Sequence, residues 1–169
     1  MADLDALFRP KSIAIIGASN RPHTIGHRIM TNLKRYGFKG TVTPVNPKGE
    51  TILDTPSCKS ILEVPGEVDL AHVIVRNTLV SKVLEDCAQK GVKVAIINTS
   101  GFKEVGQAGA EMEKQLVEIG KQTGMRLFGP NCQGVMNTDP GVSLYSNLPS
   151  RACLPGTCPW WPRGAGWPR

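Results

Sequence analysis

In residues 12–36, a short apolar run is followed directly by a glycine-bounded loop and then by an amphipathic stretch. Ser12–Ile16 is apolar enough to form a buried strand, and a loop from Gly17 to Gly26 follows it. Apolar residues then recur at helical spacing over residues 24–36. A strand that leads through such a loop into a helix presents backbone N–H groups at the helix N-terminus, where the helix dipole favours an anion. We therefore expect a ligand that carries a phosphate at this loop.

The spacing of the glycines and the charge after the second apolar run narrow the class of ligand. Gly17 and Gly26 are too far apart for the dinucleotide fingerprint G-x-G-x-x-G, which argues against an ordinary nicotinamide site. A nicotinamide site usually has an acidic residue at this distance past the glycines, where it binds the ribose hydroxyls. Residues 45–49 contain Lys48 and no acid before Glu50. A lysine suits a ribose phosphate, which coenzyme A carries at its 3′ position and NADP at its 2′ position. A solvated lysine in a turn is the alternative interpretation.

Apolar runs and helical patterns alternate along most of the chain. Such alternation, with strands that are apolar throughout, indicates a parallel sheet buried on both faces. The expected strands are residues 12–16, 41–45, 70–75, 94–98 and 126–128, and the expected helices are residues 24–36, 79–90 and 110–123. These elements predict an α/β, Rossmann-like, doubly wound domain whose mainly parallel five-stranded sheet carries helices on both faces. Ligands of such sheets bind beyond the carboxyl ends of the strands, which selects the loops at 17–26, 46–50, 76–79 and 98–109, with 129–134 nearby.

The composition argues against several classes of partner. The net charge of +6 includes three arginines and no acid in residues 151–169, and no basic stripe is interleaved with aromatic residues, so we expect no nucleic acid. No apolar run approaches the length of a membrane span, so we expect no membrane partner, and the acidic start is not that of a secretory signal. The five cysteines, an odd number without zinc-type pairs, favour reduced thiols in a cytoplasmic protein.

Polar residues follow the fourth and fifth expected strands. Thr99, Ser100 and the backbone amide of Gly101 could line a ligand cleft, and Asn131 could form a hydrogen bond across it. The alternative for the first of these loops is an ordinary connection with a Ser or Thr helix cap. Cys132 fits a buried structural thiol better than a nucleophile, because no partner base is evident.

The histidines and carboxylates do not form a recognisable reaction centre. His72 lies inside an apolar run and fits the core, whereas His23 and His27 flank the glycine loop, near the expected phosphates. The carboxylates are scattered along the chain, without an acid/base pair or a metal-binding cluster. We therefore assign no catalytic residue and no metal ligand.

Residues 148–169 differ in composition from the rest of the chain. They hold all three tryptophans, neither Val nor Ile, and a density of proline that prevents a helix or a central strand. We interpret them as out-of-frame translation or an artificial end and expect them to be unstructured. The chain then consists of one domain, residues 1–147, followed by an aberrant tail.

Six short motifs together resemble one family in their order and spacing: F-R-P-K-S at 8–12, I-G-A-S-N at 16–20, P-V-N-P at 44–47, D-L-A at 69–71, T-S-G-F at 99–102 and G-P-N-C at 129–132. They resemble the N-terminal, CoA-binding domain of the NDP-forming acyl-CoA synthetases, a group that includes ADP-forming acetyl-CoA synthetase and the succinyl-CoA synthetase alpha subunit. The resemblance covers about residues 4–147 and implies a Rossmann-like fold with coenzyme A as the cofactor. The chain departs from it after the third strand, where many members have proline and this chain has Arg76, Asn77 and Thr78.

The resemblance implies a role for each matching position. The glycine loop would hold the CoA phosphates, Lys48 would meet the nucleotide end, and the loops after the third and fourth strands would line the path of the nucleotide and the pantetheine. The implied cofactor-binding residues are Gly17, Ser19, Asn20, Arg21, Thr24, Gly26, Lys48, Val75, Asn98, Thr99, Ser100, Gly101 and Asn131.

Ligases of this family also use a phosphorylated histidine in the following domain and an ATP-grasp module, and this sequence contains no match to either. We therefore expect the CoA-binding domain of an NDP-forming acyl-CoA synthetase, truncated so that it binds CoA or acyl-CoA but is inactive in ligation by itself. Its expected partners are the missing ligase and ATP-grasp domains or a subunit that carries them. Two alternatives stay open: the cofactor domain of an NADP-dependent oxidoreductase, and a stand-alone regulatory CoA-binding protein.

Overall fold

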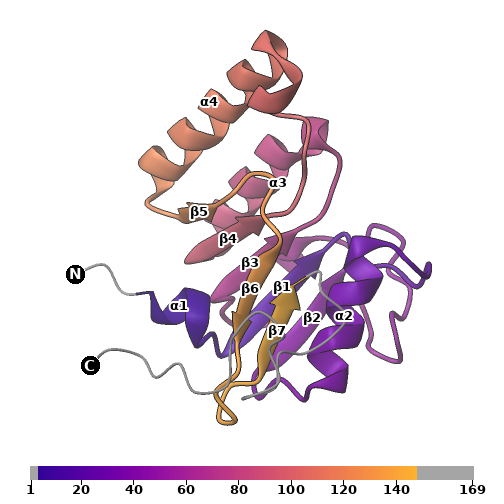
Figure 1. Cartoon of the computed structure of the whole chain (residues 1–169). Coiled ribbons are helices and arrows are strands. Elements are labelled where there is room, and N and C mark those ends of the chain that lie inside the picture. Colours follow the sequence, from indigo (N-terminus) through magenta and orange to yellow (C-terminus); the bar gives the residue numbers. More distant parts are fainter. Residues whose placement is uncertain (1–3, 148–169) are drawn as a thin grey trace, which may run out of the picture.

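The computed structural model describes residues 4–147 of the chain (Figure 1). The expectation that residues 148–169 form an unstructured tail lies outside these residues. Within the described range, no helix has the length and apolar character needed to cross a membrane.

A five-stranded parallel sheet forms the centre of the fold, in the order β2-β1-β3-β4-β5. Its strands are β1 (Ser12–Ile16), β2 (Thr41–Val45), β3 (Leu70–Val73), β4 (Val94–Ile97) and β5 (Arg126–Phe128). Every residue of β3 and β4 is buried, as the continuous apolar runs predict for strands covered on both faces. The predicted α/β, Rossmann-like class is therefore confirmed.

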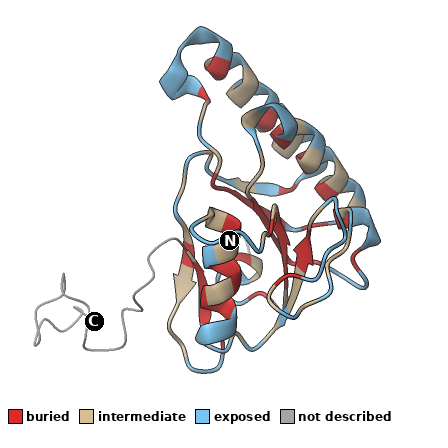
Figure 2. Cartoon of the chain, turned by 90° about the vertical axis from the view of Figure 1, so that its right-hand side faces the viewer, coloured by how far each residue is buried: buried red, intermediate tan, exposed pale blue. Residues whose placement is uncertain are grey.

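The helices α3 (Asn77–Lys90) and α4 (Gln107–Thr123) cover one face of the sheet and pack against each other (Figure 1). Alanines of three neighbouring strands form this face of the sheet and pack in one cluster with Leu84 of α3 and Leu116 of α4. Both helices begin two or three residues earlier than their apolar periodicity predicts, because their first residues carry no large apolar side chain. The buried sheet stands out between the layers in Figure 2.

The helix α2 (Ile25–Arg35), the short helix α1 (Asp5–Phe8) and an antiparallel hairpin of β6 (Gly134–Asn137) and β7 (Leu144–Asn147) cover the other face. The sequence predicted helices on this face. The structure has helices there and adds the hairpin, which was not predicted. The hairpin turns around Asp139, whose carbonyl oxygen accepts hydrogen bonds from the backbone N–H groups of Val142 and Ser143, both over 2.8 Å. One face of the hairpin supplies buried apolar side chains such as Leu144, which pack in the core beside α2.

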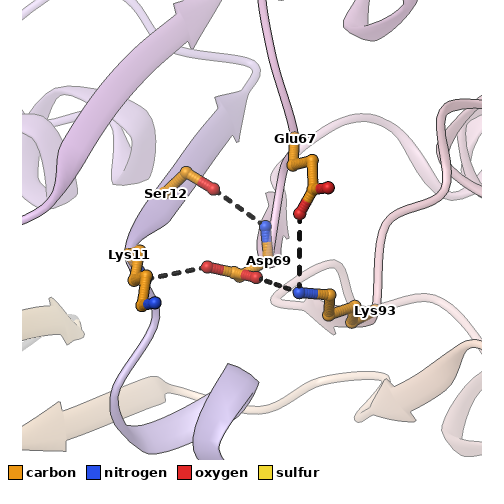
Figure 3. A network of polar contacts seen from close by, with 5 residues as sticks. All are labelled: Lys11, Ser12, Glu67, Asp69 and Lys93. Carbon is orange, nitrogen blue, oxygen red and sulfur yellow. Dashed lines mark hydrogen bonds and ion pairs between the residues drawn. The ribbon is translucent and has the colours of Figure 1, made fainter.

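A polar network fixes the amino ends of the strands (Figure 3). The carboxylate of Asp69 accepts a hydrogen bond from the backbone N–H of Lys11 over 2.8 Å and pairs with Nζ of Lys93 at 2.6 Å. The backbone N–H of Asp69 donates to Oγ of Ser12 over 3.0 Å, and Glu67 lies 3.9 Å from the same lysine. Burial opposes ionisation of Asp69, but these hydrogen bonds and the lysine charge outweigh it and lower its pKa. The network therefore holds the starts of β1 and β3 in register.

The order of the strands locates the topological switch point. From β1 the chain adds β2 on one side of the sheet. It then crosses back and adds β3, β4 and β5 on the other side. At such a reversal the loops after the two adjacent strands diverge and leave a crevice at the carboxyl edge of the sheet. The loops after β1 and β3 flank this crevice. The glycine loop therefore lies at the switch point, where ligands of open parallel sheets usually bind.

Candidate functional site

Two glycines let β1, β3 and α2 approach closely at the switch point. Gly17 follows β1 with a φ of +96°, and its N–H donates to the carbonyl oxygen of Val45 over 3.0 Å. A Cβ at Gly17 would overlap the carbonyl oxygen of Ile74, which follows β3. A Cβ at Gly26, in the first turn of α2, would overlap the carbonyl oxygen of Gly17. The N-terminus of α2 therefore lies directly against the end of β1, which only glycine at both positions allows.

The rest of the glycine loop is held by short-range hydrogen bonds. Thr24 is the N-cap of α2, and its Oγ1 accepts from the N–H of His27 over 3.3 Å. Oγ of Ser19 accepts from the N–H of Arg21 over 3.0 Å, while Nδ1 of His27 lies 3.2 Å from the carbonyl oxygen of Ser19. The side chain of Arg21 is exposed beside this helix N-terminus. The loop is thus ordered, and it places a cation beside the positive end of a helix dipole, an arrangement that suits an anion.

Asn20 ties the glycine loop to the segment after β2. Its Nδ2 donates to the carbonyl oxygen of Thr51 over 2.7 Å, and its Oδ1 accepts from the N–H of Leu53 over 3.1 Å. Both ends of the amide are therefore engaged within the protein. These two hydrogen bonds hold the glycine loop against residues 51–53.

Asn46 plays a similar part at the end of β2. Its Nδ2 donates to the carbonyl oxygen of Ala18 over 2.8 Å, and its Oδ1 accepts from the N–H of Lys48 over 2.9 Å. The side chain of Lys48 is exposed at the same edge of the sheet. Asn46 is absent from the implied cofactor-binding residues, although the motif P-V-N-P that contains it supports the resemblance.

The loops after β3 and β4 bind each other. Oγ1 of Thr99 donates to the carbonyl oxygen of Val75 over 2.6 Å, and Nδ2 of Asn77 donates to the carbonyl oxygen of Gly101 over 2.8 Å. The N–H of Gly101, expected to face a ligand, instead donates to Oε1 of Glu104 over 2.6 Å. Ser100 is exposed between them. Asn77 is one of the three residues at which the sequence departs from the resemblance described above. Its hydrogen bond joins the loop after β3 to the loop after β4.

The loop after β5 joins the same edge from the other side. The N–H of Asn131 donates to the carbonyl oxygen of Thr99 over 3.0 Å. Nδ2 of Asn98 donates to the carbonyl oxygen of Cys132 over 2.6 Å, and the side chain of Asn98 is buried. Burial raises the pKa of the Cys132 thiol despite nearby backbone hydrogen bonds, which opposes thiolate chemistry and fits the predicted structural thiol.

The structure therefore gathers all of the predicted cofactor-binding residues at the carboxyl edge of the sheet. They divide into groups that shape the backbone, such as Asn20, Asn98 and Thr99, and groups exposed toward solvent, such as Arg21 and Lys48. Within residues 4–147, no three potential metal ligands of the His, Cys, Asp or Glu types gather in one place. The arrangement can hold a phosphate-bearing molecule, and it offers neither a paired acid and base nor an activated nucleophile among the residues described.

Two cavities of the described fold lie outside the set of predicted cofactor-binding residues. One of about 410 Å³ lies between α4 and β5 and reaches Gly129 and Pro130 after β5. Apolar residues such as Leu127 and charged residues such as Glu113 line it. Another of about 540 Å³ lies over the polar network at the amino ends of the strands. Neither is lined by a predicted cofactor-binding residue.

Comparison with known proteins connects this geometry to a family. The CoA binding domain family matches residues 11–138. Acetate–CoA ligase [ADP-forming] I subunit alpha of Pyrococcus furiosus is 50% identical over 157 residues, which are 90% of this chain and 34% of that protein. 4-Hydroxybutyrate–CoA ligase [ADP-forming] of Nitrosopumilus maritimus is 47% identical over 142 residues, which are 84% of this chain and 20% of that protein.

A solved structure matches in the same way. The dinucleotide-forming acetyl-coenzyme A synthetase 1 of Ca. Korarchaeum cryptofilum, in complex with phosphate and ADP, superposes with a TM-score of 0.82 at 39% identity. The match covers 90% of this chain and 32% of that one. The chain thus spans between a fifth and about a third of the length of these three proteins.

Proposed function

The chain belongs to the CoA binding domain family, and from this premise we propose that it binds coenzyme A at the carboxyl edge of its sheet as the CoA-binding part of an NDP-forming acyl-CoA ligase. The observation that carries the proposal is the packing of Gly17 against Ile74 and of Gly26 against Gly17. This packing opens the N-terminus of α2 at the switch point, where a pyrophosphate can lie against backbone N–H groups.

The proposed pose follows from the distribution of charge along the edge. The pyrophosphate lies over residues 19–26, beside the exposed guanidinium of Arg21. The 3′-phosphate of the nucleotide lies at Lys48, which the hydrogen bond to Asn46 holds next to the glycine loop. The pantetheine then runs past Val75 and residues 98–101, whose mutual hydrogen bonds form the opposite wall.

The relatives named above support a role that is independent of the acyl group. One is named for acetate and the other for 4-hydroxybutyrate, yet this chain is nearly as similar to the second as to the first, at 47% and 50% identity. A region that is about equally similar in ligases named for two different acyl groups is suited to bind what their reactions share, which is CoA. We assign the acyl group and the phosphate chemistry to parts of the ligase beyond this domain.

Calorimetric titration of the full chain with CoA, dephospho-CoA and NADP tests the proposal. CoA should bind more tightly than dephospho-CoA, and NADP should bind weakly or not at all. Heat with NADP but none with CoA would refute the proposal and favour the oxidoreductase alternative.

Lys48→Ala tests the assignment of the 3′-phosphate. A charge-assisted hydrogen bond is worth about 1.5–3 kcal/mol, less where water screens it, so the variant should lose about ten-fold in CoA affinity and much less in dephospho-CoA affinity. Lys39→Ala is the matched control, because Lys39 is an exposed lysine that lines a cavity with Arg9 and Lys11 at the opposite end of the sheet. Equal losses for both ligands in the Lys48 variant would show that this lysine does not bind the 3′-phosphate.

A further inference from the structure

A line of hydrogen bonds runs through the core from the β6–β7 hairpin to the loops at the carboxyl edge. Oγ of Ser146, in β7, lies 2.6 Å from Nδ1 of His72 in β3. The other ring nitrogen, Nε2, bonds Oδ1 of Asn98, and Nδ2 of Asn98 donates to the carbonyl oxygen of Cys132 over 2.6 Å. His72 and Ser146 are 0% exposed and Asn98 is 6% exposed. Water therefore does not compete for these bonds, and leaving any of these groups unpaired would be costly.

The chemistry of the groups fixes the direction of each bond. A carbonyl only accepts, so Asn98 presents its NH₂ group to Cys132 and its oxygen to His72. Because that oxygen also only accepts, Nε2 of His72 carries the hydrogen. Burial lowers the pKa of His72 to about 3 from 6.5, so the ring is neutral at neutral pH and Nδ1 is an acceptor. The Ser146 hydroxyl then donates to Nδ1, and the ring is held in a single tautomer.

Asn98 is the residue at which this line reaches the site. The loops after β4 and β5 also meet through two backbone bonds, from the N–H of Asn131 to Thr99 over 3.0 Å and from the N–H of Cys132 to Ile97 over 3.4 Å. In the first loop Asn98 lies between the two acceptor residues, Ile97 and Thr99, and its side chain bonds the carbonyl oxygen of Cys132 in the second. Its orientation therefore governs how the second loop lies against the first.

We infer that His72 is a positioning residue of the CoA site, which acts through Asn98 to hold the loop at 129–132 against the loop at 98–101. The inference rests on the proposed function for its effect on CoA. It makes the β6–β7 hairpin a support of the site, because Ser146 completes the bonding of the ring.

Three variants of the full chain test this inference. His72→Leu removes the bond to Asn98, whereas His72→Gln keeps an amide donor for Oδ1 of Asn98. Val135→Ala is the control for simple loss of stability. Val135 is buried in β6, in the apolar cluster that holds Ile15 and Ile96, the neighbours of His72 in the sheet, and its side chain takes no part in the hydrogen bonds above. The readouts are the hydrogen-exchange protection of the Asn131 amide without ligand, the affinity for CoA by calorimetry, and the ¹⁵N chemical shifts of the His72 ring.

We expect His72→Leu to lose protection at Asn131 and about ten-fold in CoA affinity, and His72→Gln to recover most of both. Val135→Ala should lose stability but keep both properties. The ring shifts of the unmodified protein should show hydrogen on Nε2 alone. If His72→Leu does not fold, Ser146→Ala carries the same test with a smaller expected loss, about three-fold.

Wild-type protection and CoA affinity in folded His72→Leu would overturn the inference, as would equal losses in His72→Leu and Val135→Ala. If the unmodified chain binds no CoA, the proposed function fails. The protection of Asn131 in the free protein still decides whether His72 positions the loop.

Discussion

Gly17→Ala changes the backbone position on which the proposed site depends most. Gly17 has a φ of +96°, and a Cβ there would overlap the carbonyl oxygen of Ile74. This region of φ costs a residue with a side chain about 1–2 kcal/mol. Overlap with a main-chain atom, which cannot rotate away, costs about 1–3 kcal/mol more. We therefore expect the variant to lower the free energy of unfolding by about 2–5 kcal/mol.

Two other glycines separate these two contributions. Gly66 has a φ of +71° but open space where a Cβ would lie, so Gly66→Ala should cost only the conformational part, about 1–2 kcal/mol. Gly26 lies inside α2, where alanine is favoured over glycine by up to about 1 kcal/mol. Its Cβ would nevertheless overlap the carbonyl oxygen of Gly17. Gly26→Ala should therefore isolate the overlap and cost less than Gly17→Ala.

Urea unfolding followed by far-ultraviolet circular dichroism measures all three variants. Circular dichroism is chosen because all three tryptophans lie in residues 148–169, outside the residues that the structure describes. Folded Gly17→Ala should also bind CoA more weakly, since relief of the overlap moves the end of β1 away from α2. Equal losses of stability in Gly17→Ala and Gly66→Ala would refute the reasoning, because they would show that the approach to Ile74 imposes no constraint.

Two further predictions concern pH. Burial lowers the pKa of His72 to about 3 from 6.5, so between these values the unfolded chain binds a proton that the folded chain does not. Stability relative to His72→Gln should therefore fall as pH decreases through this range, by at most about 1.4 kcal/mol per pH unit, and a flat difference in urea titrations would contradict the assignment. The pKa of Asp69 is held below 3.8 by Lys93 and backbone N–H groups that outweigh its burial, so its contribution is present above that pH and lost below it; Asp69→Asn should remove this part of the acid sensitivity, and an unchanged acid profile would contradict it.

The central sheet could be predicted from the sequence because its signal is local. The strands at 12–16, 41–45 and 126–128 have the predicted bounds, and Thr24 caps α2 as a threonine before a helical pattern should. The β6–β7 hairpin could not be predicted in the same way, because its strands mix polar and apolar residues and lack the continuous apolar run that marks β3 and β4. The turn around N-T-D-P-G at 137–141 is the one local signal that could have indicated it.

The position of the candidate site could be predicted as a set of loops but not as a set of contacts. The rule for parallel sheets selected the loops beyond the carboxyl ends of the strands, and the structure has these loops at one edge of the sheet. The partners of Asn20 and Asn98 lie far along the chain, at 51–53, 72 and 132. No sequence pattern reports such pairings, so the division between residues that shape the edge and residues that face solvent required the structure. That these residues bind CoA stays a prediction.

Amide chemical-shift mapping of the full chain during a titration with CoA tests the central claim most directly. The proposed pose predicts that the largest ¹H–¹⁵N shifts fall in residues 17–26, with further shifts at Lys48 and residues 98–101. The cavity over the polar network at the amino ends of the strands, around Glu67 and Lys93, should show none. Shifts that cluster at that cavity, or an unchanged spectrum at a large excess of CoA, would contradict the account.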